Sequence, residues 1–134
     1  MLKRMLDDRN KEEGFTLIEL LVVIIIIGIL AAIAIPVFLN QRASGWDAAV
    51  QADLRNAATA QETVLTEGSN YTDSITALGS AGFKFSGDGN YQAASASFEN
   101  ITFDAGNSYC MDSVSQSGTT FKYSSPGGLE EGTC

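Results

Sequence analysis

The sequence predicts an α+β protein in which one long N-terminal α-helix packs on a small antiparallel β-sheet. Two patterns predict this fold. The first half of the chain holds an apolar run and then apolar residues at spacings of three and four, which is typical of one helix with a membrane-spanning half and an amphipathic half. The last third holds short alternating segments divided by turn residues, which is typical of paired strands.

A short segment of mixed charge, residues 1–13, precedes Gly14 and the apolar run. Its basic residues are Lys3, Arg4, Arg9 and Lys11. Basic residues hold a segment on the cytoplasmic side of a membrane and acidic ones contribute little, so the N-terminus is predicted to stay inside. The shortness of the segment favours a removable leader over a cytoplasmic domain. An ordinary secretory signal cut after Ala34 is the alternative, but its first region would not be half acidic.

The apolar run that begins at Phe15 can cross a membrane. Residues 20–39 carry no charge, and at about 1.5 Å of rise per residue they span about 30 Å, the hydrocarbon thickness of a bilayer. The one charge in the run, Glu19, lies one helical turn after Phe15, and a carboxylate in lipid needs a partner. Gly28 and Pro36 interrupt the run, and the proline removes a backbone hydrogen bond, so the helix is predicted to be weakest there.

These residues resemble the N-terminus of type IV pilins and the related pseudopilins. The resemblance rests on the charged leader, Gly14, Phe15 and the string TLIELLVVIIIIGILAAIAIP, and it is specific as far as Arg42. It implies the pilin fold. It also implies that a membrane-embedded aspartyl peptidase cleaves between Gly14 and Phe15 and methylates the new amine. During assembly, Glu19 would pair with that amine of a neighbouring subunit; a carboxylate that only reaches the lipid headgroups is the alternative.

The same resemblance implies that the stretch between Gly28 and Pro36 loses helicity on assembly. The alternative is that both residues are merely tolerated, as in other membrane helices. The predicted domains are a prepilin leader at residues 1–14, a membrane-spanning and polymerising half of the helix at residues 15–39, and a globular pilin head with the amphipathic half at residues 40–134.

The amphipathic stripe is expected to be the face on which the rest of the head packs. Its members are Trp46, Val50, Leu54, Ala57, Gln61, Val64 and Leu65. Polar residues lie between them, among them Asp53, which is therefore predicted on the solvent face. One helix is expected over residues 15–66, with Gly45 as a soft spot and Gly68 as a left-handed C-terminal cap.

The remainder is predicted to form a loop and then three or four antiparallel strands. Residues 69–82 are the loop or a helical turn, with Ile75 and Leu78 as its buried points. The expected strand segments are residues 83–85, 98–104, 108–115 and 119–124. The expected turns are residues 86–90, 105–107 and 117–118, and the strands are expected to be followed by the segment 125–128 and a C-terminal tail.

Charge and composition limit the function. The formal charge of −8 comes from residues 15–134, because the leader is neutral overall, and such an acidic chain disfavours general nucleic-acid binding. Without histidine the chain lacks the usual general base, so neither an enzyme nor a cofactor is expected. A calcium site is conceivable but disfavoured, because the chain has no D-x-D-x-D-G loop. The carboxylates that suggest it are Asp88, Asp104, Asp112, Glu130 and Glu131.

Both cysteines, Cys110 and Cys134, lie beyond the membrane segment. That position suggests an oxidising exterior and one disulfide, with two free thiols as the alternative. Closing a loop of about 25 residues would stabilise the head by roughly 3 to 4 kcal/mol in the chain-entropy model. The resemblance to type IV pilins, many of which close their C-terminal region in this way, supports the bond.

Together these features predict the structural subunit of a type IV pilus. The expected partners are other copies of the chain, the prepilin peptidase and methyltransferase, the pilus assembly machinery and, before assembly, the membrane. The subunit is expected in the cytoplasmic membrane as a single-pass protein and later in an extracellular filament. The alternatives are a pseudopilin of a type II secretion or DNA-uptake machine and an uncleaved single-pass membrane-anchored binding protein.

Overall fold

The computed structural model describes residues 14–68, 70–92, 97–104 and 107–134. The predicted cytoplasmic leader, apart from Gly14, lies outside these residues, and so do two of the three residues expected in the turn at 105–107. Contacts divide the chain after Leu39 into two compact units. The first unit contains the start of helix α2, and the second contains the rest of that helix and the other helices and strands that the structure describes.

Helix α2 covers Leu17–Gly68 and is continuous through Gly28, Pro36 and Gly45. The prediction of one long helix is therefore confirmed. Its last residue differs from the expectation, because Gly68 is itself helical and has no positive φ. Glycine tolerates the left-handed conformation but does not impose it, so its presence near a helix end does not define a cap.

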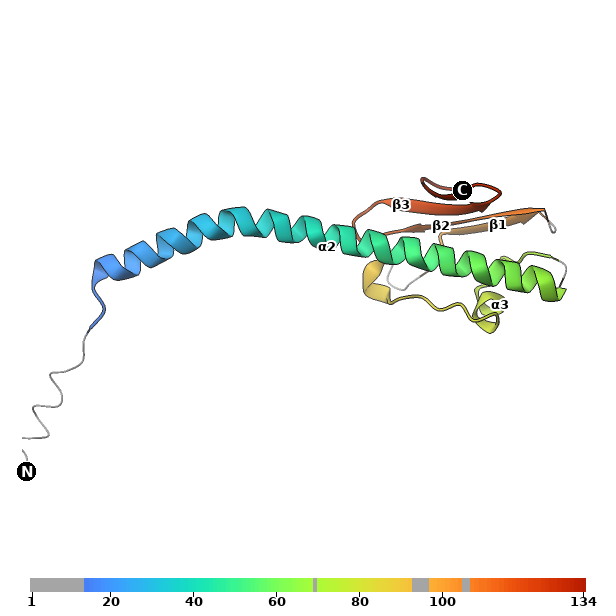
Figure 1. Ribbon diagram of the computed structural model, residues 1–134, viewed down its shortest axis with the longest axis horizontal. Helices are drawn as coiled ribbons and strands as arrows, with labels where there is room; N and C mark the ends of the chain where they lie inside the picture. Colours follow the sequence, from blue (N-terminus) through green and yellow to red (C-terminus); the bar gives the residue numbers. More distant parts are fainter. Residues whose placement is uncertain (1–13, 69, 93–96, 105–106) are drawn as a thin grey trace, which may run out of the picture. The chain divides into compact units, whose positions relative to one another are not determined.

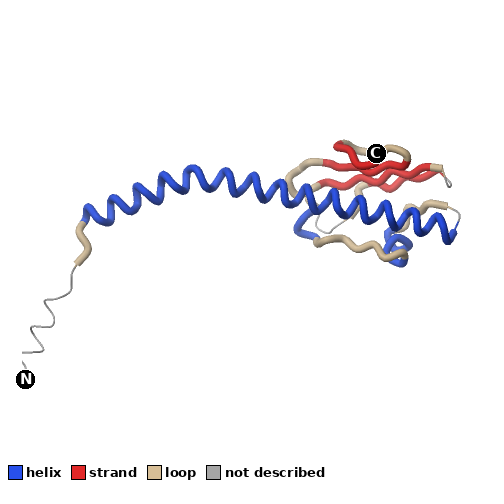
Figure 2. The backbone as a smooth tube through the Cα atoms, viewed as in Figure 1, coloured by secondary structure: helices blue, strands red, loops and turns tan. Residues whose placement is uncertain are grey.

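Four strands form one antiparallel sheet in the order β1-β2-β3-β4 (Figures 1 and 2). The strands are β1 (Asn100–Asp104), β2 (Ser108–Val114), β3 (Thr120–Ser125) and β4 (Gly128–Glu131). Each strand pairs with the next along the chain, for example Met111 with Tyr123 and Lys122 with Glu130. The sheet is therefore a simple meander, and the expected antiparallel sheet is confirmed.

Two details of the strand prediction were wrong. Residues 83–85 form no strand, although Phe83 is buried and Phe85 is half-buried. Their aromatic rings instead pack on those of Phe98 and Tyr91, with centroids 5.4 Å apart for Phe83 and Phe98 and 5.5 Å apart for Phe85 and Tyr91. The expected tail contains β4, because a two-residue turn after β3 lets the chain pair back along it.

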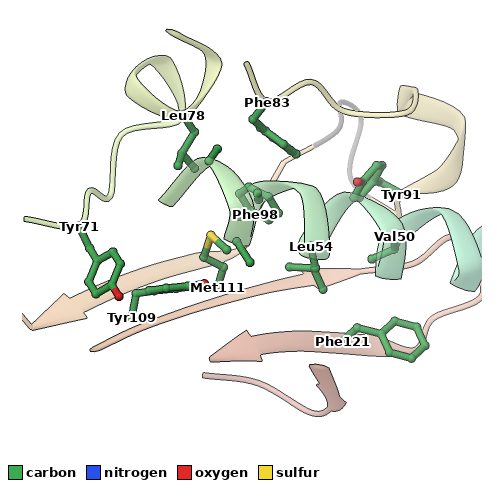
Figure 3. Close-up of a cluster of buried hydrophobic side chains, with 13 residues drawn as sticks. Val50, Leu54, Tyr71, Leu78, Phe83, Tyr91, Phe98, Tyr109, Met111 and Phe121 are labelled. Atoms are coloured by element: carbon green, nitrogen blue, oxygen red, sulfur yellow. The ribbon is translucent and has the colours of Figure 1, made fainter. Parts of the chain in front are cut away.

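The core of the head is formed by the second half of α2, the sheet and the segment that connects them, and Figure 3 shows buried side chains from all three. Val50, Leu54, Ala57 and Gln61 of the predicted stripe are fully buried, so the stripe is the packing face as expected. On the sheet side the core is completed by side chains such as Met111.

Helix α3 (Ile75–Ser80) forms the predicted helical turn in the connection that follows α2. Ser74 caps it by accepting a hydrogen bond from the Ala77 N–H, 3.3 Å away. Leu78 is fully buried as predicted, but Ile75 is 43% exposed. In so short a helix only one side can face the core, and Leu78 occupies it.

Asp53 was predicted on the solvent face but is only 2% exposed. Its Oδ2 accepts hydrogen bonds from the Ser86 N–H and the Ser86 hydroxyl, both 2.9 Å away, and from the Tyr91 hydroxyl. A buried carboxylate is tolerated when donors surround it in this way. Asp53 therefore ties α2 to the irregular segment around 3-10 helix η2 (Asp88–Asn90).

Burial raises the pKa of Tyr91 and Tyr109 well above the ordinary value of 10.0, and for Tyr91 the hydrogen bond to Asp53 adds to the effect. Above about pH 10 the unfolded chain releases these protons while the folded chain keeps them, so the free energy of unfolding should fall as the pH rises. Below that pH the stabilisation is fully present.

Urea denaturation at several pH values between about 8 and 11 measures this loss. In the Tyr91→Phe variant the loss should be smaller, because one of the shifted hydroxyls is gone. A free energy of unfolding that stayed constant across this range would contradict the expectation.

Candidate functional site

The apolar half of α2 exposes its side chains all around. Every large apolar residue from Phe15 to Leu39 is at least 45% exposed. Within the described residues, α2 is the one helix long and apolar enough to cross a membrane. A continuous apolar surface of this kind is unfavourable in water and indicates a lipid or protein environment.

The first turn of this helix contains a reciprocal cap. The Thr16 N–H and the Thr16 hydroxyl donate to Glu19 Oε2 at 2.9 and 2.7 Å, and the Glu19 N–H donates to the Thr16 hydroxyl oxygen at 3.2 Å. This is the capping box, in which residues three apart satisfy each other's backbone donors at a helix start. The pattern T-x-x-E before an apolar run could have predicted it from the sequence.

The contacts from Thr16 use only one of the two carboxylate oxygens of Glu19. Within the described residues, Oε1 accepts no hydrogen bond. Glu19 is flanked by the apolar side chains of Ile18, Leu20 and Val22. The carboxylate is therefore oriented by its own helix and retains an oxygen that can accept a donor from outside the chain.

Gly28 and Pro36 both lie inside the continuous helix. A Cβ added at Gly28 would meet no atom within 4 Å, so nothing within the described chain requires a glycine there. A helix interior that contains both residues is intrinsically less stable than one without them. The helix is nevertheless continuous through both of these less stable positions.

The disulfide Cys110–Cys134 joins β2 to the C-terminal residue, with 5.8 Å between the two Cα atoms. Asp112, two residues after Cys110 and so on the same face of β2, is fully buried. Its Oδ2 accepts the Cys134 N–H at 2.7 Å, and its Oδ1 accepts the Asn100 N–H at 2.9 Å. Asp112 thus fixes the position of the residue to which Cys110 is bonded.

The carboxylates considered for calcium are not gathered into one site. In the part of the chain that the structure describes, no three Asp, Glu, Cys or His residues are placed to hold a metal ion. Asp112 is occupied by the backbone contacts above, and Glu130 Oε2 lies 3.5 Å from Lys122 Nζ. The structure gives no geometric support to the calcium hypothesis within these residues.

The chain begins its helix with an exposed apolar half, and an acid caps the first turn. An α+β head closed by a disulfide follows along the chain. These features together define the pilin class of protein. The sequence comparisons agree with this class. Residues 9–35 match the prokaryotic N-terminal methylation motif.

The chain is 40% identical over 114 residues to the type IV wide pilus major component PilA4 of Thermus thermophilus, covering 85% of this chain and 82% of that one. The chain belongs to the type IV pilin family. It is also 42% identical to the type IV major pilin protein PilA of Myxococcus xanthus over 71 residues, 53% of this chain and 32% of that one. For the type IV major fimbrial protein FimA of Dichelobacter nodosus the identity is 45% over 65 residues, 48% of this chain and 42% of that one.

Proposed function

We propose that the chain is the precursor of a structural subunit of a type IV pilus. The observation that carries this proposal is the exposed apolar half of α2 with Glu19 in its first turn. The names of the relatives, which are major pilus and fimbrial proteins, support it. No chemical reaction is assigned to the chain.

The first step of the proposed mechanism is cleavage between Gly14 and Phe15 by the prepilin peptidase, followed by methylation of the Phe15 amine. Both residues are exposed and precede the first helical residue, Leu17, so the peptide bond is accessible without unwinding the helix. A Cβ added at Gly14 would meet no atom within 4 Å, so packing does not require a glycine at this position.

In the second step, Glu19 receives the methylated Phe15 amine of a neighbouring subunit. Glu19 Oε2 is engaged by Thr16, and Oε1 is the oxygen we assign to the incoming amine. An unpaired charge among apolar side chains is strongly unfavourable, so pairing selects one depth at which a new subunit enters. The cap contributes by holding the carboxylate in one orientation before the partner arrives.

The filament then forms by packing the apolar halves of many copies against one another. Contacts that repeat head-to-tail without closing produce a fibre rather than a ring. We infer that the subunit passes from the cytoplasmic membrane to an extracellular pilus through the pilus assembly machinery. Gly28 and Pro36 supply the weak positions at which the helix can lose hydrogen bonds as the subunits pack.

The N-terminal peptide of the protein from its native cells tests the processing step. Mass spectrometry should find a chain that begins at Phe15 and carries one methyl group, and imaging should find surface filaments. A chain that begins at Met1 would indicate a membrane-anchored binding protein. A chain that begins at Ile35 would indicate a secreted one, and either result contradicts the proposal. Correct processing with fibres confined to the envelope would instead indicate a pseudopilin.

A pair of glycine variants sharpens this test. Gly14→Leu should leave the chain uncleaved, because the peptidase recognises the residue before the cut, whereas Gly45→Ala should be processed normally. At both positions an added Cβ would meet no atom within 4 Å. Normal cleavage of the Gly14→Leu variant would exclude the assigned cleavage site.

A further inference from the structure

Arg42 and Trp46 form a pair on the exposed surface of α2, within the head unit. The Arg42 Cζ atom lies 5.1 Å from the centroid of the Trp46 ring. Residues four apart in a helix lie on the same face, so this contact is built into the helix itself. Arg42 is exposed and Trp46 is half-buried. A guanidinium that lies over an aromatic ring is restricted in orientation by that contact.

The charge pattern around Arg42 is unusual for this chain. Residues 40–134 contain eleven acidic and four basic residues, and Arg42 is the only basic residue in residues 15–54. It also comes three residues after Leu39, the last residue of the apolar run. A single cation is therefore placed where the chain leaves the apolar segment.

These two side chains suit the boundary of a membrane. Tryptophan is enriched at the level of the lipid headgroups, because its ring is apolar and its N–H needs a polar partner. The guanidinium group matches a phosphate with two parallel hydrogen bonds, and a stacked guanidinium loses less freedom when it binds one. The apolar run before the pair would lie in the hydrocarbon region of the bilayer.

We propose that Arg42 and Trp46 form a headgroup site that binds a phospholipid phosphate of the outer leaflet before assembly. The site would set the depth of the apolar run, and so the positions of Glu19 and of the cleavage site at the start of that run. This inference rests on the membrane stage of the proposed function. The other arginine of α2, Arg55, is exposed on the head but lies 13 residues further along. At about 1.5 Å per residue, Arg55 is about 20 Å from Arg42 and out of reach of the headgroups.

Trp46 is the only tryptophan of the chain, so all tryptophan fluorescence comes from this position. The full chain is reconstituted into vesicles of phosphatidylcholine and phosphatidylglycerol whose acyl chains are brominated either near the headgroup or near the methyl end. Bromine near the headgroup should quench Trp46 more strongly than bromine near the methyl end. Trp46 emission that is quenched by neither lipid, in chains shown by protease protection to be inserted, would overturn the inference.

Variants of the two arginines separate the site from general charge. Arg42→Gln should lose the preference for quenching near the headgroup, and the matched control Arg55→Gln should keep it. Equal quenching in Arg42→Gln and the unmodified chain, or an equal loss in both variants, would contradict a site at Arg42. A chain that fails to insert at all would count against the membrane stage of the proposed function. A Trp46 signal that changes only when copies polymerise would assign the pair to a contact between subunits.

Discussion

Replacing Glu19 by alanine should abolish pilus filaments while leaving membrane insertion intact. The substitution removes the carboxylate that we assign to the neighbouring Phe15 amine, so the amine of an entering subunit would be left unpaired among apolar side chains. Insertion should not suffer, because an apolar run without its charge enters lipid more readily. Filaments sheared from cells and imaged by electron microscopy, together with the membrane fraction of the subunit, measure the two effects.

The capping contacts make the choice of control decisive. Glu19→Ala removes the helix cap as well as the charge, because Thr16 N–H and hydroxyl both donate to Glu19. Glu19→Gln keeps an oxygen for those donors and removes only the charge. If charge pairing drives assembly, the Gln variant should also lack filaments. If the Gln variant assembles normally, the role of Glu19 is to cap the helix, and the proposed ion pair is wrong.

Removing the disulfide should lower the free energy of unfolding of the head by roughly 3 to 4 kcal/mol, because the loop that it closes in the unfolded chain is released. The two cysteines are 24 residues apart in sequence. Urea denaturation of the full chain in detergent, followed by the fluorescence of Trp46 with and without reductant, measures the difference. The helical signal of the apolar half should not change. An unchanged midpoint on reduction would show that the bond contributes nothing to the head.

A substitution of Asp112 tests whether this side chain positions Cys134 for its disulfide with Cys110. In Asp112→Asn one oxygen is replaced by an NH2 group, so the side chain can no longer accept from both the Cys134 N–H and the Asn100 N–H. Cys134 should then be less firmly placed, and the disulfide should be reduced more easily at a given concentration of thiol. Ser124→Ala, on the neighbouring strand β3, is the matched control. Equal resistance to reduction in all three proteins would contradict a positioning role for Asp112.

The features that could be predicted from the sequence are those fixed over short distances along the chain. The apolar run, the stripe that includes Val50 and Leu54, and the turn at residues 117–118 depend on residues a few positions apart, so periodicity and turn chemistry predict them. The capping box of Thr16 and Glu19 is equally local, and its T-x-x-E pattern is sufficient to predict it. The roles of Gly14, Glu19, Gly28 and Pro36 in processing and assembly remain predictions that the experiments above address.

The misassigned elements share one cause. Phe83 and Phe85 alternate as a strand would, but their rings pack on Phe98 and Tyr91, and within the described residues they pair with no strand. The β4 segment, GLEE, carries little β-propensity and becomes a strand because β3 offers it a free edge after a tight turn. Pairing partners decided both outcomes, and those partners are brought together only by the folded chain.

The sequence alone determined the long helix, its division into an apolar and an amphipathic half, and the family to which the chain belongs. The tertiary structure decided which polar groups are interior. Asp53 and Asp112 look like surface carboxylates in the sequence, yet both are buried, because donors from Ser86, Tyr91 and Cys134 surround them. A buried charge is stable only where such donors converge, and their convergence depends on contacts between residues 22 to 38 positions apart.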